Sequence, residues 1–154
     1  MSQYETKLTQ YIKDNNIKAE LLTFNQSTHS VAEAAAAVGA EAGDFVKSIC
    51  MIGPNEELIV AIVKGEHRAS TTRVSKTLGI ERPRIANPDE MLEKSGYPAG
   101  GTPAFGYDAV FLMDPKVLEK EKVYSGGGSE QALTLMSPQE MQKANGAKVA
   151  RVRS

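Results

Sequence analysis

The sequence has few of the residues that bind metal ions or cross-link a chain. Among its 154 residues there are one cysteine (Cys50), two histidines (His29 and His67) and no tryptophan. A single cysteine cannot form an internal disulfide, it argues against a structural zinc site, and neither histidine lies in a metal-ligand motif. We therefore expect a protein without a metal ion or other cofactor, in the reducing environment of the cytoplasm.

Long hydrophobic runs and a strong excess of charge are also absent. No apolar run approaches the roughly 20 residues needed to cross a bilayer, and the first residues lack the apolar core of a signal peptide, so we expect no membrane association. The net charge of −1 argues against a large nucleic-acid-binding surface but leaves room for a local patch. A solvated basic face would explain the candidate patch equally well. The candidates are Arg68, Arg73, Lys76, Arg82 and Arg84.

Several catalytic motifs are missing as well. The chain has no G-x-S-x-G nucleophile elbow and no Walker loop. Its composition, with 41% hydrophobic and 24% charged residues, is that of an ordinary globular protein. The length suits a single domain over residues 1–154, and no repeat or linker divides it.

Capping residues mark five expected helices. Capping boxes of the form S-x-x-E begin at Ser2, Ser30 and Ser137, and Asn87 followed by Pro88 is a further start signal. Glycines stand where four of these helices should end. The expected helices cover about residues 2–15, 30–38, 70–78, 88–95 and 137–145.

Apolar segments between these helices predict strands. A turn at residues 54–57 joins two of them into a hairpin. Because helices and strands are interleaved, we expect an α/β (α+β) fold with a mixed, partly antiparallel sheet surrounded by helices. The expected strands cover residues 19–24, 45–52, 58–63, 84–86, 108–113, 123–125, 132–135 and 149–152.

Lys47 interrupts one of the apolar strands. Side chains alternate along a strand, which places Lys47 on the same face as Phe45, Ile49 and Met51. A lysine at a strand end can lie along apolar surface while its ammonium reaches water. The alternative is a cation at the lip of a pocket, held for an anion or a developing oxyanion.

Two glycine-rich segments are the other candidates. Residues 100–106 read GGTPAFG, and residues 126–128 are three glycines between two strands. Glycine allows main-chain N–H groups to approach a ligand closely, and proline stiffens a loop. An ordinary surface loop and a hairpin turn are the simpler interpretations.

The order of the segments is more specific than any one of them. The chain presents SVAEAA from Ser30, FVKSI from Phe45, VKGEHR from Val63, RVSKTLG from Arg73, then the loop at residues 100–106 and VYSGGG from Val123. Over about residues 15 to 153 this order resembles the YbaK/ProX family of aminoacyl-tRNA editing deacylases. Ala104 stands where that family commonly has proline, with Pro103 just before it.

The resemblance implies a trans-editing hydrolase that releases a small amino acid, such as Ala, Ser, Thr or Cys, from mischarged tRNA. Its partners would be the tRNA acceptor end and a tRNA synthetase. A non-catalytic module that binds aminoacyl-tRNA or an amino acid beside a synthetase is the alternative. Lys47 and Gly101 are the expected catalytic residues, through charge and a main-chain N–H. The expected substrate-binding residues are Ser30, Gly100, Thr102, Pro103, Gly106, Gly126, Gly127 and Gly128.

Overall fold

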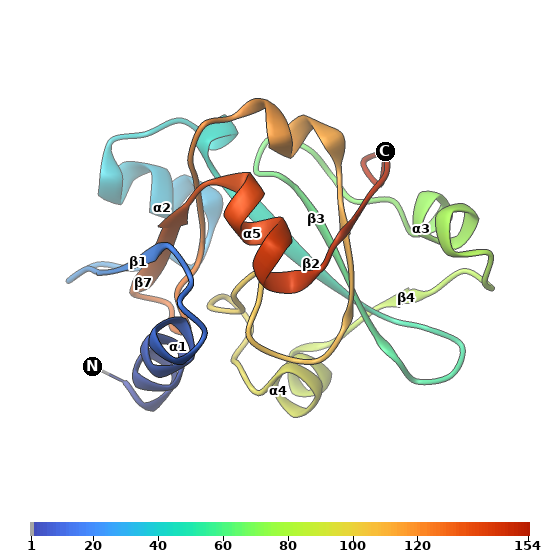
Figure 1. Cartoon of the computed structure of the whole chain (residues 1–154), viewed down its shortest axis with the longest axis horizontal. Coiled ribbons are helices and arrows are strands. Elements are labelled where there is room, and N and C mark those ends of the chain that lie inside the picture. The colour runs from blue at the N-terminus through green and yellow to red at the C-terminus, as the bar shows by residue number, and fades with distance from the viewer. Residues whose placement is uncertain (1) are drawn as a thin grey trace.

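Two β-sheets organise the chain in the computed structural model, which describes residues 2–154 (Figure 1). The smaller sheet is antiparallel, with the order β1-β7-β6, and the larger sheet has the order β4-β2-β3-β5-β8. In the larger sheet β2 pairs antiparallel with β3 and β4, whereas β5 runs parallel to β3 and to β8. The expected mixed, partly antiparallel architecture is confirmed, divided into two sheets. The strands are β1 (Ala19–Thr23), β2 (Val46–Ile52), β3 (Leu58–Lys64), β4 (Arg84–Ile85), β5 (Val110–Met113), β6 (Val123–Gly126), β7 (Ala132–Met136) and β8 (Lys148–Val149).

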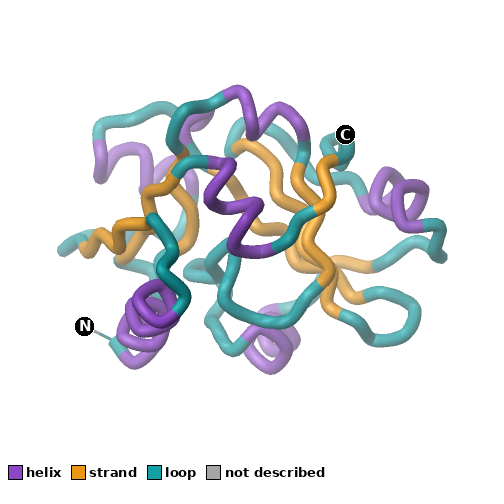
Figure 2. The backbone as a smooth tube through the Cα atoms, viewed as in Figure 1, coloured by secondary structure: helices purple, strands orange, loops and turns teal. Residues whose placement is uncertain are grey.

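Five α-helices surround the sheets in the described part of the chain (Figure 2). Each begins where the sequence predicted, with an N-cap side chain that accepts a main-chain N–H three residues later, as Ser2 does from Glu5. Four end at a glycine in the left-handed conformation. The helices are α1 (Gln3–Asp14), α2 (Val31–Val38), α3 (Thr71–Leu78), α4 (Pro88–Ser95) and α5 (Pro138–Asn145).

The hairpin of β2 and β3 lies at the centre of the larger sheet. Every residue from Leu58 to Val63 is buried, because β3 has a strand on both edges and side chains packed on both faces. Val60 and Ile62 belong to the larger core cluster, and Ile59 and Ala61 to a second cluster on the other face. The sheet is therefore a rigid support for anything that β2 presents.

The C-terminal strand is shorter than the sequence predicted. Residues 149–152 were expected as a strand, but β8 covers only Lys148–Val149. After it, the N–H groups of Val152 and Arg153 donate to the buried carboxylate of Asp114, at 3.0 and 3.2 Å. A side chain takes the place of a neighbouring strand there. Two 3₁₀ segments, Ala42–Asp44 and Pro115–Glu119, were not anticipated.

The two sheets meet at the start of β2. An isolated parallel bridge joins Phe45 to Tyr124 of β6, and the two rings stack with centroids 5.0 Å apart. Beyond this bridge the two strands no longer pair.

No helix within residues 2–154 has the length and apolar character needed to cross a membrane.

Candidate functional site

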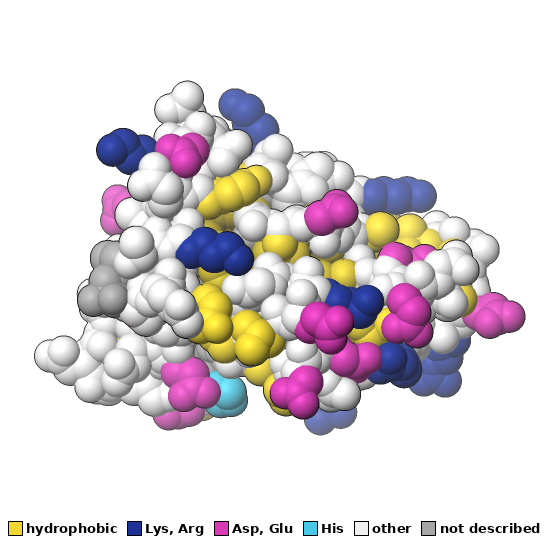
Figure 3. All heavy atoms as spheres, turned by 90° about the horizontal axis from the view of Figure 1, so that it is seen from below, with side chains coloured by type: hydrophobic (Ala, Val, Ile, Leu, Met, Phe, Trp, Pro, Cys, Tyr) yellow, Lys and Arg dark blue, Asp and Glu magenta, His cyan; other side chains and the backbone are white. Residues whose placement is uncertain are grey.

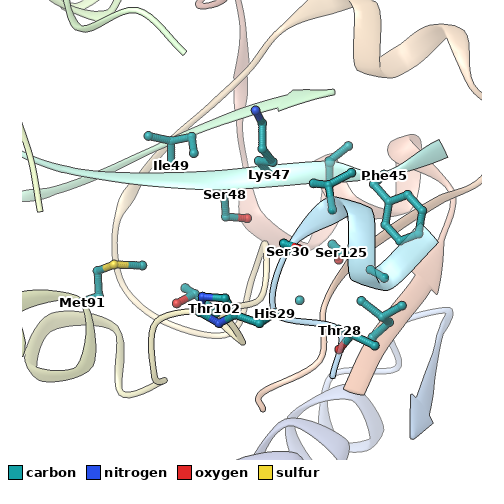
Figure 4. A pocket seen from close by; sticks show the side chains of 16 residues that line it. Thr28, His29, Ser30, Phe45, Lys47, Ser48, Ile49, Met91, Thr102 and Ser125 are labelled. Atoms are coloured by element: carbon teal, nitrogen blue, oxygen red, sulfur yellow. The ribbon is translucent and has the colours of Figure 1, made fainter. Parts of the chain in front are cut away.

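A cavity of about 230 Å³ lies beside the first half of β2, next to the point where β6 leaves it (Figure 4). Its lining comes from segments far apart in the chain: the start of α2, β2, Met91 of α4, the loop after α4, β6 and β7. A concave site with a mainly apolar wall and a few polar groups is the usual form of a small-molecule pocket.

The structure brings together half of the site residues that the sequence predicted. The residues on the lining are Ser30, Lys47, Gly100, Thr102 and Gly126. The remaining predicted residues lie outside the lining, although they belong to the same two loops. They are Gly101, Pro103, Gly106, Gly127 and Gly128.

The two glycine segments pack directly against each other. The N–H of Gly128 donates to the carbonyl of Gly101 at 2.7 Å. A side chain on Gly101 would bring its Cβ within 2.5 Å of the Ser129 nitrogen, and one on Gly126 within 2.2 Å of the Thr102 carbonyl oxygen. Glycine is therefore required here for close approach of two main chains.

Gly101 has its own N–H engaged. That N–H donates to the carbonyl of Pro98 at 3.1 Å, which closes the loop on itself. Its neighbours Gly100 and Thr102 are the loop residues that reach the lining, and the Thr102 hydroxyl donates to the same Pro98 carbonyl at 3.0 Å. The geometry gives Gly101 a part in shaping the loop that carries these neighbours.

One edge of β2 is open along the cavity. Residues 45, 47, 49 and 51 direct their main-chain groups to β3, as the bond from Gly65 N–H to the Phe45 carbonyl shows. The intervening residues direct theirs to the other edge, where the Cys50 carbonyl accepts from Ala86 at 2.9 Å. Since β4 pairs only with Met51 and Ile52, the main chain of Ser48 faces the cavity without a neighbouring strand.

Lys47 lines the cavity, and its side chain leaves β2 on the side opposite to Ser48 (Figure 4). Burial lowers the pKa of its ammonium, and the nearby Arg68 guanidinium lowers it further. None of the ion pairs within residues 2–154 includes Lys47. A partly buried cation without an acidic partner is available to an anionic ligand.

The serine hydroxyls at the cavity differ in their partners. The hydroxyl of Ser48 is buried and has no hydrogen-bond partner among the described residues, whereas that of Ser125 on β6 is bonded to Thr134. Sequence reasoning passed over Ser48, because a serine beside a lysine in a strand gives no signal by itself. Only the position of the open edge shows where its side chain lies.

His29 is a second residue that the sequence did not single out for this site. It lies on the lining so close to Gly100 that a Cβ there would be 2.0 Å from His29 Nδ1. The same nitrogen is 3.1 Å from the Glu130 carboxylate. Because His29 and Glu130 are separated by about a hundred positions, no local motif could have paired them.

The candidate basic patch is partly occupied by internal contacts. Arg82 donates to the Thr71 hydroxyl at 2.6 Å, and Arg84 makes two bonds to Glu90 that hold the pKa of that carboxyl at about 2. The side chains of Arg68, Arg73 and Lys76 are exposed. On the face seen in Figure 3, basic and acidic side chains are interspersed.

Cys50 does not line the cavity, and the described residues form no cluster of metal-binding side chains. Cys50 is buried in the core beside Val46 and Ile52, and burial raises the pKa of its thiol to about 12. The thiol therefore stays protonated near neutral pH. Within residues 2–154, no three His, Cys, Asp or Glu side chains gather as a metal ion would need.

Comparison with known proteins agrees with the family resemblance seen in the sequence. The family model of the aminoacyl-tRNA editing domain matches residues 25–144. The uncharacterized protein YwhH of Bacillus subtilis (strain 168) is 24% identical over 151 residues, which are 97% of this chain and 93% of that protein.

Two solved structures share the fold over nearly their whole length. A hypothetical protein, APE2540, is 33% identical with a TM-score of 0.89, covering 96% of this chain and 99% of its own. A protein described as a proposed trans-editing enzyme for prolyl tRNA synthetase is 27% identical with a TM-score of 0.92, covering 100% and 99%.

Proposed function

Since the chain belongs to the aminoacyl-tRNA editing domain family, we propose that it is a cytoplasmic hydrolase that deacylates mischarged aminoacyl-tRNA. The observation that carries the proposal is the cavity beside β2, which combines a mainly apolar wall with an unpaired cation and free main-chain groups. An ester with one reactive carbonyl and a small side chain suits such a site.

The reaction is the hydrolysis of one ester bond. A water oxygen bonds to the ester carbonyl carbon, and a tetrahedral oxyanion forms. The bond from that carbon to the ribose oxygen then breaks, and a proton from the water ends on the ribose hydroxyl. The products are a free amino acid and uncharged tRNA.

The residues of the cavity have different parts in this proposal. Lys47 contributes positive charge and positioning, because an ordinary lysine, with a pKa of about 10.4, is a cation at neutral pH and a poor base. Ser30, Gly100, Thr102 and Gly126 shape the place of the aminoacyl group. Gly101 and Gly128 support it by joining the two loops through a main-chain hydrogen bond, and we assign Pro103, Gly106 and Gly127 to the supporting parts of the same loops.

The substrates that we propose carry a small amino acid: alanine, serine, threonine or cysteine. A synthetase pocket distinguishes two side chains that differ by one methylene by only about 1–3 kcal/mol, so a second hydrolytic site is a physical answer to that limit. The partner would be the acceptor end of such a tRNA, with a tRNA synthetase beside it.

A panel of purified mischarged tRNAs tests the proposal. The wild-type protein should release the amino acid from at least one of the four classes, under single-turnover conditions, and leave correctly charged tRNAs intact. If none of these esters is hydrolysed faster than in buffer alone, the protein is not the deacylase that we propose.

The alternative, a module that binds aminoacyl-tRNA without hydrolysing it, draws support from one observation. The main-chain groups of Gly101 and Gly128 are engaged with each other and with Pro98, so this part of the loop pair offers no free donor to an oxyanion. A binding module would slow spontaneous hydrolysis of the ester in the same assay, whereas a deacylase accelerates it.

A further inference from the structure

Ser48 brings three polar groups to one point of the cavity. Its hydroxyl is buried without a partner among residues 2–154, and it lies on the side of β2 that faces Thr102 and His29 (Figure 4). Its N–H and carbonyl face the open edge of the strand, where the weak thiol donor of Cys50, at 3.9 Å, is the one group of the described chain that donates to the carbonyl. Buried polar groups are normally paired, so unpaired ones in a pocket indicate a polar ligand.

The groups at Ser48 include acceptors for a ligand that donates hydrogen bonds. The carbonyl oxygen is an acceptor and the N–H is a donor, while the hydroxyl has two acceptor lone pairs, can also donate, and turns freely about its bond. None of the described residues that line the cavity is an aspartate or glutamate. The one lysine on the lining, Lys47, extends from the opposite side of β2 (Figure 4). The Lys47 side chain therefore does not fill the space beside the Ser48 hydroxyl (Figure 4).

We propose that Ser48 binds the α-ammonium group of the aminoacyl ester, so that the site distinguishes aminoacyl-tRNA from N-acylated aminoacyl-tRNA. This inference rests on the proposed function for its ligand. An α-ammonium carries three N–H donors and no acceptor, which complements the hydroxyl and carbonyl of Ser48. An N-acyl group removes the charge and two of these donors, and it adds bulk beside β2.

A binding measurement tests this without requiring hydrolysis. The probes are 3′-deoxy-3′-(L-alanylamino)adenosine, in which a stable amide replaces the ester, and its N-acetyl derivative. Calorimetry on the full chain gives both Kd values. Wild type should bind the free amine at least about tenfold more tightly, because a hydrogen bond to a charged group is worth that factor or more.

Variants of Ser48 then test whether its hydroxyl causes the preference for the free-amine probe. Ser48→Ala should reduce the ratio of the two Kd values about tenfold, and Ser48→Thr, which keeps the hydroxyl, should preserve it. Ser48→Cys is nearly the same size with weak hydrogen bonding, so it gives the same answer if Ser48→Ala fails to fold. Ser75→Ala is the matched control, since that hydroxyl donates to the Ile80 carbonyl at 2.6 Å on α3, away from the cavity.

Each outcome has a definite meaning. Equal binding of both probes by wild type, absence of binding, or an unchanged ratio in Ser48→Ala and Ser48→Cys would each overturn the inference. If wild type discriminates between the probes but hydrolyses no mischarged tRNA, the inference holds and the deacylase proposal fails.

Discussion

The two halves of β2 belong to one strand but have different surroundings. Its second half, Cys50 to Ile52, is buried and has β3 on one edge and β4 on the other. Its first half, Lys47 to Ile49, is only partly buried, pairs with β3 alone and lines the cavity. We call them the closed half and the open half.

The difference shows how a sheet can hold a site without losing stability. The open half keeps every hydrogen bond to β3, so its position is fixed, while its free edge has unpaired groups that can bind a ligand. The closed half is anchored on both edges. A substitution in the open half should therefore affect activity, and one in the closed half should affect stability.

The largest expected effect is on activity, in the open half. Lys47→Ala should lower the single-turnover rate of deacylation about 100- to 1,000-fold, the usual loss when a group that stabilises an oxyanion is removed. The melting temperature should stay close to that of wild type, because Lys47 makes no ion pair within residues 2–154. Lys143→Ala, on the exposed surface of α5, is the matched control. A rate within threefold of wild type would remove Lys47 from the mechanism.

In the closed half, a substitution should lower the stability of the fold and leave the activity of the folded protein unchanged. Ile52 is 2% exposed, so Ile52→Ala should destabilise the fold by about 2–5 kcal/mol, through lost burial and the cavity left behind. Urea denaturation measures this. The rate per folded molecule should stay within twofold of wild type at a temperature where the variant is folded. A rate loss comparable to that of Lys47→Ala would break the distinction between the halves.

Asp114, like the closed half of β2, should affect stability, and its effect should depend on pH. Burial raises the pKa of its carboxyl, but the N–H groups of Lys116, Arg153 and Val152 and the Arg153 guanidinium outweigh burial and hold the pKa below its ordinary value. Such a carboxylate stabilises the fold above the unfolded pKa, about 3.9 for aspartate. This contribution is lost as the pH falls through the lower folded pKa.

We therefore expect Asp114→Asn to be less stable than wild type by about 1–3 kcal/mol near pH 7. The gap should narrow as the pH falls below about 4, the ordinary pKa of aspartate. Urea denaturation at several pH values measures it. Because Asp114 lies after β5, away from the cavity, the rate of the folded variant at pH 7 should not change. A gap that stays constant down to the lowest pH would contradict the assignment.

The smallest expected effect is that of a chelator. Dialysis against EDTA should leave the deacylation rate within twofold of that of the untreated protein, since no ligand set gathers within residues 2–154. The tRNA must be refolded with magnesium in a separate step, so that its own folding is not affected. Activity that is lost and then restored by zinc on the protein alone would show that the open half works with a metal ion.

Much of the fold was predictable from short stretches of sequence. The N-cap side chains at Ser2, Ser30 and Ser137 and the glycines that end four helices act within a single turn, so local sequence marks the helix boundaries. The end of the chain was predicted less well. Val152 reads as a strand residue, but its N–H is bonded to Asp114, 38 positions away, which no local pattern indicates.

The sequence by itself determined the α-helices, most of the strands and the family, and it suggested Lys47 and the two glycine segments as candidates. Only the tertiary structure decided that β4 covers half of β2 and leaves Ser48 on an open edge, that His29 meets Glu130, and that Gly101 packs against the second loop while Gly100 and Thr102 reach the cavity. The physical reason is range. Capping and alternation act between residues a few positions apart, whereas a pocket depends on which strand edges and loops the packed core brings together.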